Sequence, residues 1–127
     1  MRWEYYSKEI DMEKVIIWHN PRCRKSREGL QYLQNNGVEP EVFDYMKTPF
    51  SPEELAEIIQ LSGQPVEEFI RRNEKEYKTL GFNKRKLSIV EFAEICSNHP
   101  RLLQRPIVIK GSSVVLARPV SKIDEIL

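Results

Sequence analysis

Cys23 is the residue whose type and setting in this sequence are best suited to covalent chemistry. It follows the apolar run Val15-Ile16-Ile17-Trp18 and precedes a segment with helical spacing, so it falls between a predicted strand and a predicted helix. The unpaired N–H groups and the dipole at a helix N-terminus favour an anion, and a thiolate is one. The position therefore predicts a nucleophilic cysteine with a lowered pKa.

Polar and basic side chains surround Cys23 in the sequence. His19 lies just upstream, and Ser26, three residues on, can donate its hydroxyl to the sulfur. Cationic neighbours, which lower the pKa of a thiol, are Arg22, Arg24, Lys25 and Arg27. Because a serine cannot resolve a mixed disulfide, the pattern indicates chemistry by a single thiol. The alternative interpretation is that Cys23 is an inert, small hydrophobic residue.

The other candidate ligands and nucleophiles give weaker signals. Cys96 lies on the apolar face of a predicted helix, a spacing typical of core packing, and we expect it to be buried. The two histidines, His19 and His99, are too few for a zinc site, and no Cys-x-x-Cys spacing is present. No metal is therefore expected.

The composition indicates one folded domain without a strong overall charge. The 127 residues are 40% hydrophobic and 31% charged, with a net charge of +1. Such a chain can bury a core, and no global field would recruit nucleic acid or an acidic membrane. The run Lys84-Arg85-Lys86 lacks interleaved aromatic residues and is predicted to be a solvated loop. Because no apolar stretch has the length of a membrane span or the pattern of a signal peptide, we expect a cytoplasmic protein.

The order of predicted elements is that of an α/β protein. A strand at 15–18, a helix after Cys23 that stops at Asn35-Asn36-Gly37, and a strand at 38–45 form a β-α-β unit. Later elements are helices after capping boxes at Ser51-Pro52-Glu53-Glu54 and Ser88-Ile89-Val90-Glu91, a short helix at 65–70, a hairpin over 107–116 and a closing helix over 119–127.

This connectivity, β-α-β, a helical insert and then β-β-α, is that of a thioredoxin-like fold with a four-stranded mixed sheet. We expect a single domain over 13–127, with the helical insert at about 51–99. Residues 1–12 show no clear periodicity and are predicted to be an N-terminal extension, compatible with disorder.

Two arginines precede prolines near the end of the chain. A residue before proline is pushed toward extended conformations, so Arg105 and Arg118 should project from strand ends. In thioredoxin-like folds the proline before the third strand is commonly cis and lies beside the active-site cysteine. By this analogy Pro106 is the candidate cis-proline, and Arg105 would lie close to Cys23.

These residues resemble a known family. The string Ile17-Trp18-His19-Asn20-Pro21-Arg22-Cys23, followed by Ser26-Arg27, resembles the active-site segment of glutaredoxin-coupled arsenate reductases of the thioredoxin superfold. The similarity continues over almost the whole chain, in Phe69-Ile70-Arg71-Arg72-Asn73, in His99-Pro100 with Arg105-Pro106-Ile107, and in Leu116-Ala117-Arg118-Pro119.

The resemblance implies an enzyme that reduces arsenate to arsenite. The Cys23 thiolate would attack arsenate, and glutathione and glutaredoxin would then take over and reduce the adduct, with no bound cofactor. By the same matching, His19 would help to lower the pKa of Cys23 and Ser26 would bond to the thiolate. The implied cradle for the oxyanion consists of Arg71, Arg105 and Arg118, since guanidinium groups stay protonated and donate several hydrogen bonds.

Two other functions stay open. One is a monothiol, glutathione-dependent disulfide oxidoreductase, in which the basic surroundings of Cys23 would bind the carboxylates of glutathione. After the cysteine, where the family has a small residue, this sequence has the basic residues Arg24 and Lys25. The other is a redox-related transcription regulator that binds RNA polymerase, although such regulators usually sense oxidation through Cys-x-x-Cys. For the reductase we expect a small oxyanion substrate, glutaredoxin and glutathione as partners, neither nucleic acid nor membrane, and a chain that can act as a monomer.

Overall fold

The computed structural model describes residues 14–127, which form two compact units. The first unit combines residues 14–44 with Arg105–Leu127, and the second is Tyr45–Gln104. The predicted helical insert falls in the second unit, whereas the predicted extension at 1–12 lies outside the described residues. Among residues 14–127, no helix has both the length and the apolar character that crossing a bilayer requires.

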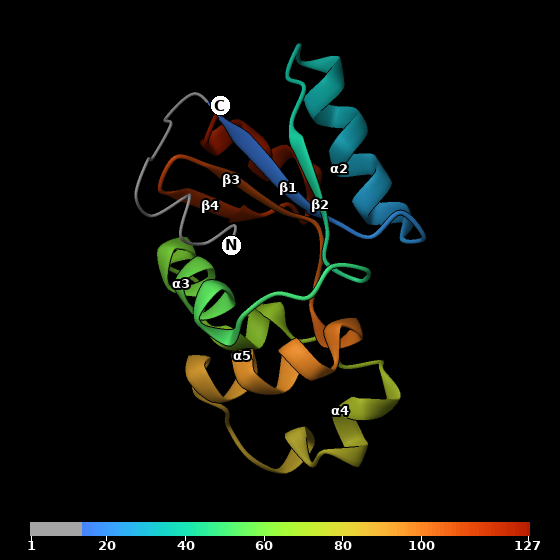
Figure 1. Ribbon diagram of the computed structural model, residues 1–127, viewed down its shortest axis with the longest axis vertical. Coiled ribbons are helices and arrows are strands. Elements are labelled where there is room, and N and C mark those ends of the chain that lie inside the picture. The colour runs from blue at the N-terminus through green and yellow to red at the C-terminus, as the bar shows by residue number, and fades with distance from the viewer. Residues whose placement is uncertain (1–13) are drawn as a thin grey trace. The chain divides into compact units, whose positions relative to one another are not determined.

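The first unit is built on a four-stranded mixed sheet (Figure 1). The strand order is β2-β1-β3-β4, in which β1 runs parallel to β2 and antiparallel to β3, and β3 runs antiparallel to β4. This arrangement confirms the α/β class and the mixed sheet. The strands are β1 (Val15–His19), β2 (Glu41–Asp44), β3 (Ile107–Lys110) and β4 (Ser113–Leu116).

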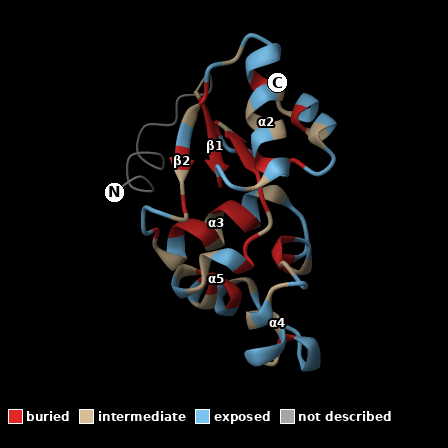
Figure 2. Ribbon diagram, turned by 90° about the vertical axis from the view of Figure 1, so that its right-hand side faces the viewer, coloured by how far each residue is buried: buried red, intermediate tan, exposed pale blue. Residues whose placement is uncertain are grey.

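The strand β1 lies inside the sheet, paired on both edges, and every one of its side chains is buried. Its β-branched and aromatic residues suit a strand that is covered on both faces. Figure 2 shows it coloured as buried along its length. The parallel partner β2 is shorter than the predicted strand at 38–45, and Pro40, which has no N–H to donate to a ladder, lies directly before it.

The helix α2 (Arg24–Asn35) connects the two parallel strands and packs on one face of the sheet. It ends where the sequence indicated, because Gly37 adopts the left-handed conformation with a φ of 77° that glycine tolerates best. The core on this face consists of Val15, Ile17, Leu33, Val108, Val115, Ala117 and Ile123.

The closing segment is a 3-10 helix, η4 (Val120–Glu125), that packs on α2 and β4. Its spacing of three residues per turn directs Val120 and Ile123 toward the same core. The hydroxyl of Tyr32 on α2 donates a hydrogen bond to Asp124, so a polar contact joins the two helices beside the apolar one.

The second unit is helical. Its two longest helices, α3 (Pro52–Ser62) and α5 (Ile89–Asn98), pack against each other through apolar faces. Ser51 caps α3 by accepting from the Glu54 N–H, and Ser88 with Glu91 forms the complete capping box predicted for α5. The shorter elements are η1 (Val66–Phe69), α4 (Lys75–Thr79), η2 (Phe82–Lys84) and η3 (Pro100–Leu102).

Candidate active site

The residue Cys23 occupies the N-cap position of α2. Its N–H donates to the carbonyl of Asn20 at 2.9 Å, and its own carbonyl accepts from the Arg27 N–H at 3.0 Å. The first bond closes a tight turn after β1, and the second starts the helix. The thiol is partly exposed at the end of the helix whose free N–H groups favour an anion.

Two opposing effects act on the pKa of the Cys23 thiol. Partial burial raises the pKa, whereas a hydrogen bond from the Arg105 side chain, the backbone N–H groups of Ser26 and Lys25, and the positive charge of Arg105 lower it. The lowering effects prevail, so the pKa lies below the ordinary value of a cysteine. A larger share of the sulfur is therefore the nucleophilic thiolate at neutral pH.

The sheet brings Arg105 to this sulfur. Trp18 of β1 pairs with Ile107 of β3, so the residues just before β3 lie at the end of β1 that leads to Cys23. The side chain of Arg105 is only 8% exposed, and the Arg105–Pro106 peptide bond is cis. A guanidinium held in such a buried place keeps a fixed direction toward the thiol.

The second arginine of the expected cradle, Arg118, is joined directly to the first. Its Nη1 donates to the backbone carbonyl of Arg105 at 3.2 Å. The residue follows β4 and is exposed, and its peptide bond to Pro119 is also cis. Cys23, Arg105 and Arg118 thus all belong to one unit of the chain.

The third arginine, Arg71, belongs to the second unit. Its N–H donates to the carbonyl of Leu102 at 2.7 Å, and its side chain forms an ion pair with Glu74 at 3.4 Å. These contacts hold the backbone and the guanidinium in place within that unit. Its participation in the oxyanion cradle stays a prediction.

The hydroxyl of Ser26 bonds to His19 of β1 and to Asn20 in the turn rather than to the sulfur. Its oxygen lies 2.9 Å from Nδ1 of His19 and accepts from the Asn20 N–H, also at 2.9 Å. Since that oxygen is occupied as an acceptor, its single proton can be donated to Nδ1 of a neutral imidazole. Ser26 therefore acts on Cys23 through its backbone N–H.

His19 serves this arrangement as an uncharged group. Burial lowers the pKa of its imidazole, and the charge of Arg27 adds to that effect, while Asp44 and Ser26 oppose it. The imidazole is consequently neutral at pH 7 and gives the thiolate no positive charge. Its contribution is to fix the Ser26 side chain at the start of α2.

Two positioning residues escaped the sequence analysis. Asn20 accepts from the Arg22 N–H through Oδ1 at 3.0 Å and so shapes the turn before Cys23. At Gly29 of α2, an added Cβ would lie 2.6 Å from Cγ of Pro106. A glycine inside a helix lowers the stability of that helix, so its presence in the sequence indicates that another part of the chain packs closely there.

The second cysteine, Cys96, lies in the core of the second unit with no exposed surface. Burial strongly raises the pKa of its thiol, which keeps it protonated and unreactive. The interpretation of Cys96 as a core residue is confirmed. Within the described residues no group of three His, Cys, Asp or Glu side chains is placed to hold a metal ion.

Residues 18–126 match the ArsC family. The chain belongs to the ArsC family. An arsenate reductase of Haemophilus influenzae is 39% identical over 114 residues, which cover 89% of this chain and 98% of that protein. One of Escherichia coli is 35% identical over 116 residues, which cover 91% of this chain and 82% of that protein.

The ArsC family fold agrees with solved structures. The arsenate reductase structure from Vibrio cholerae superposes with a TM-score of 0.84 at 37% identity. The superposition covers 92% of this chain and 100% of the other. The thioredoxin-like fold expected from the order of elements is thereby confirmed, as is the family resemblance.

Replacing Arg105 should raise the pKa of Cys23. In Arg105→Ala the sulfur loses both a hydrogen bond and a nearby charge, so its titration should move upward by about one pH unit or more. Arg24→Ala is the matched control, because Arg24 is exposed and lies beside Cys23 without being a cause of its lowered pKa. The thiolate absorbance in the ultraviolet reports both titrations. Equal shifts in the two variants would mean that general positive charge, and not the Arg105 contact, activates the thiol.

The variant Gly29→Ala should disturb the same contact from the other side. Alanine favours the helix by about 1 kcal/mol over glycine, but forcing its methyl against the Pro106 ring costs about 1–3 kcal/mol. We expect a displaced Arg105 and a higher pKa of Cys23, measured by the pH dependence of alkylation, with stability unchanged or reduced in urea unfolding. A variant that gains the full helical stabilisation and keeps the wild-type pKa would show that Gly29 does not position the site.

Proposed function

We propose that this protein reduces arsenate to arsenite, with glutathione and glutaredoxin supplying the electrons. The observation that carries the proposal is the contact between the Cys23 thiol at the N-terminus of α2 and the buried guanidinium of Arg105. It combines a nucleophile whose lowered pKa favours the thiolate with a permanent cation that favours an anionic reactant.

Arginine side chains suit the substrate. Arsenate is a tetrahedral oxyanion, and a guanidinium donates several hydrogen bonds in one plane without losing its charge. Arg105 and Arg118 are tied to each other in the first unit, and Arg71 is the proposed third arm of the cradle. The same cations would stabilise negative charge that develops on the oxygens as the thiolate attacks.

The proposed reaction begins when the Cys23 thiolate attacks arsenic. A sulfur–arsenic bond forms, and one arsenate oxygen leaves as water after it accepts protons. Two glutathione thiols, acting directly or through glutaredoxin, then give up two electrons and end as a disulfide. Arsenic(V) becomes arsenic(III), arsenite is released and Cys23 returns as a thiolate.

The chain's own cysteines support an external source of electrons. The sequence has two cysteines, and Cys96 is buried with a strongly raised pKa. A resolving thiol must be accessible and ionised, and Cys96 is neither. Glutathione is a small thiol that reaches a partly exposed sulfur, and we propose it as the cosubstrate.

A second candidate function is the reduction of mixed disulfides by the same cysteine. The observation in its favour is the set of exposed basic side chains next to Cys23, which would attract the carboxylates of glutathione. Of these, Arg24 and Lys25 lie 3.4 Å and 3.7 Å from Glu28, so part of their charge is already balanced. The Arg105 contact at Cys23 favours the oxyanion substrate.

A coupled assay tests the proposed function. Arsenate, glutathione, glutaredoxin and glutathione reductase are combined, and arsenate-dependent NADPH consumption is followed. Wild type should consume NADPH, Cys23→Ser should fall to background because it lacks the nucleophile, and Cys96→Ser should retain most of the activity. The last variant is the control for loss of a thiol in general.

The outcomes separate the candidates. Activity with a glutathione mixed disulfide but none with arsenate, both dependent on Cys23, would replace the arsenate proposal with the second candidate. Arsenate turnover that survives in Cys23→Ser would contradict the mechanism. An absence of NADPH consumption with both substrates would contradict it as well.

A further inference from the structure

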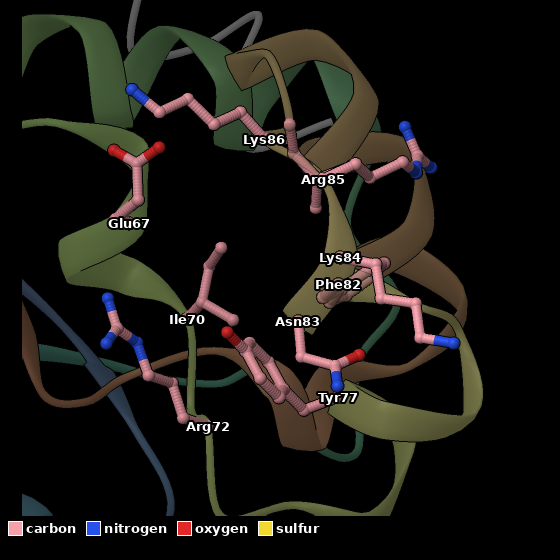
Figure 3. Close-up of a pocket in the computed structure, with 10 residues that line it drawn as sticks. Glu67, Ile70, Arg72, Tyr77, Phe82, Asn83, Lys84, Arg85 and Lys86 are labelled. Carbon is pink, nitrogen blue, oxygen red and sulfur yellow. The ribbon is translucent and has the colours of Figure 1, made fainter.

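The second unit contains a cavity of about 430 Å³ that the proposed reaction does not use (Figure 3). Its apolar wall consists of Ile70, Phe82 and Leu87, and the ring of Tyr77 adds an aromatic surface. A volume of this size is in the range of pockets that bind small organic molecules. None of the first-unit residues around Cys23 lines it.

The apolar wall is held by packing and is therefore largely preformed. Ile70, Phe82 and Leu87 are 7%, 5% and 6% exposed. Tyr77 meets Phe82 edge to face at a centroid distance of 6.1 Å, and Ile70 forms a β-bridge with Leu103. A ligand entering this cavity would not have to order its walls first.

The rim of the cavity carries unbalanced positive charge. Lys86 extends along the upper side of the cavity and the guanidinium of Arg72 lies on the lower side, while Lys84 and Arg85 point away (Figure 3). Neither Lys86 nor Arg72 forms an ion pair with any residue in the described part of the chain. The one lining carboxylate is Glu67, so the groups that face the opening sum to one positive charge.

A hydroxyl group also points into the cavity. Figure 3 shows the hydroxyl of Tyr77 directed into the cavity beside Ile70. A phenol at the end of an apolar wall can donate a hydrogen bond to an anion or accept one from a neutral group. The cavity thus joins apolar side chains to two cations and one hydroxyl.

We propose that this cavity binds a small amphipathic carboxylate, with an apolar body of about the size of a fused ring system and a single negative charge. The body would lie against Phe82 and Leu87, and the carboxylate would bond to the guanidinium of Arg72, while the ammonium of Lys86 on the other side of the cavity would offset the charge of Glu67 (Figure 3). Arginine pairs with a carboxylate through two parallel hydrogen bonds, and a monoanion balances the net charge of the rim. The site is separate from the proposed arsenate chemistry and does not depend on it.

Naphthoate is the probe for this site. The full chain is titrated with it while backbone amide NMR signals of the cavity residues are followed. We expect saturable shifts at Tyr77, Phe82 and Leu87 with a millimolar or tighter dissociation constant. Naphthamide, which has the same rings without the charge, should bind about tenfold more weakly or worse.

Charge-removing variants locate the carboxylate. The double variant Arg72→Gln with Lys86→Gln should weaken naphthoate binding about tenfold or more and leave naphthamide binding unchanged. Lys78→Gln is the matched control, since Lys78 is exposed on α4 and does not line the cavity. All three side chains are exposed or lie at a rim, and thermal unfolding checks that the variants keep the fold.

Several results would overturn the inference. They are an absence of saturable shifts at the cavity residues, equal binding of naphthamide and naphthoate, or an equal loss of binding in Lys78→Gln. Naphthoate binding should persist in Cys23→Ser, so a failure of this site and a failure of the arsenate proposal are distinguishable.

Discussion

The contact between Arg105 and Cys23 is the interaction on which the first unit depends for its chemistry. It joins a side chain two residues before β3 to the residue before α2, and it exists because β3 pairs with β1 in a register that places Ile107 opposite Trp18. The thiolate needs the cation to outweigh the burial that raises its pKa. The thiolate in turn stabilises the cation, because Arg105 is almost fully buried and a buried charge is more stable beside an opposite charge.

The surrounding residues shape that contact without taking part in chemistry. His19 holds Ser26, Ser26 and Lys25 present their N–H groups to the sulfur, and Gly29 leaves room for Pro106 against α2. Each acts by position, which explains why small or neutral groups serve here. The exposed arginines and the one lysine next to Cys23 contribute less than their number suggests, because solvent screens them and Glu28 lies close to two of them.

The sequence was most informative where a local rule decides the structure. Burial of β1, the end of α2 just before Gly37 and the capping box at Ser88 all follow from short-range patterns, and the structure bears them out. The helix α4 left no such pattern, because none of its five residues is buried. The partner of the Ser26 hydroxyl was also beyond local rules, since only the folded turn shows that Asn20 and His19 occupy it. Likewise, the sequence predicted only a solvated loop for Lys84-Arg85-Lys86, whereas the structure shows that Lys86 lines a cavity.

The fold sets the two cysteines of this chain far apart in reactivity, because it lowers the pKa of Cys23 and raises the pKa of Cys96. The most direct test is alkylation of the unmodified protein over a range of pH, with each cysteine followed separately by peptide mass spectrometry. From this difference we predict that Cys23 reacts with a midpoint below the ordinary pKa of a cysteine, while Cys96 stays unmodified until the protein unfolds. A midpoint for Cys23 at or above the ordinary value, or equal reaction of both thiols in the folded protein, would contradict it.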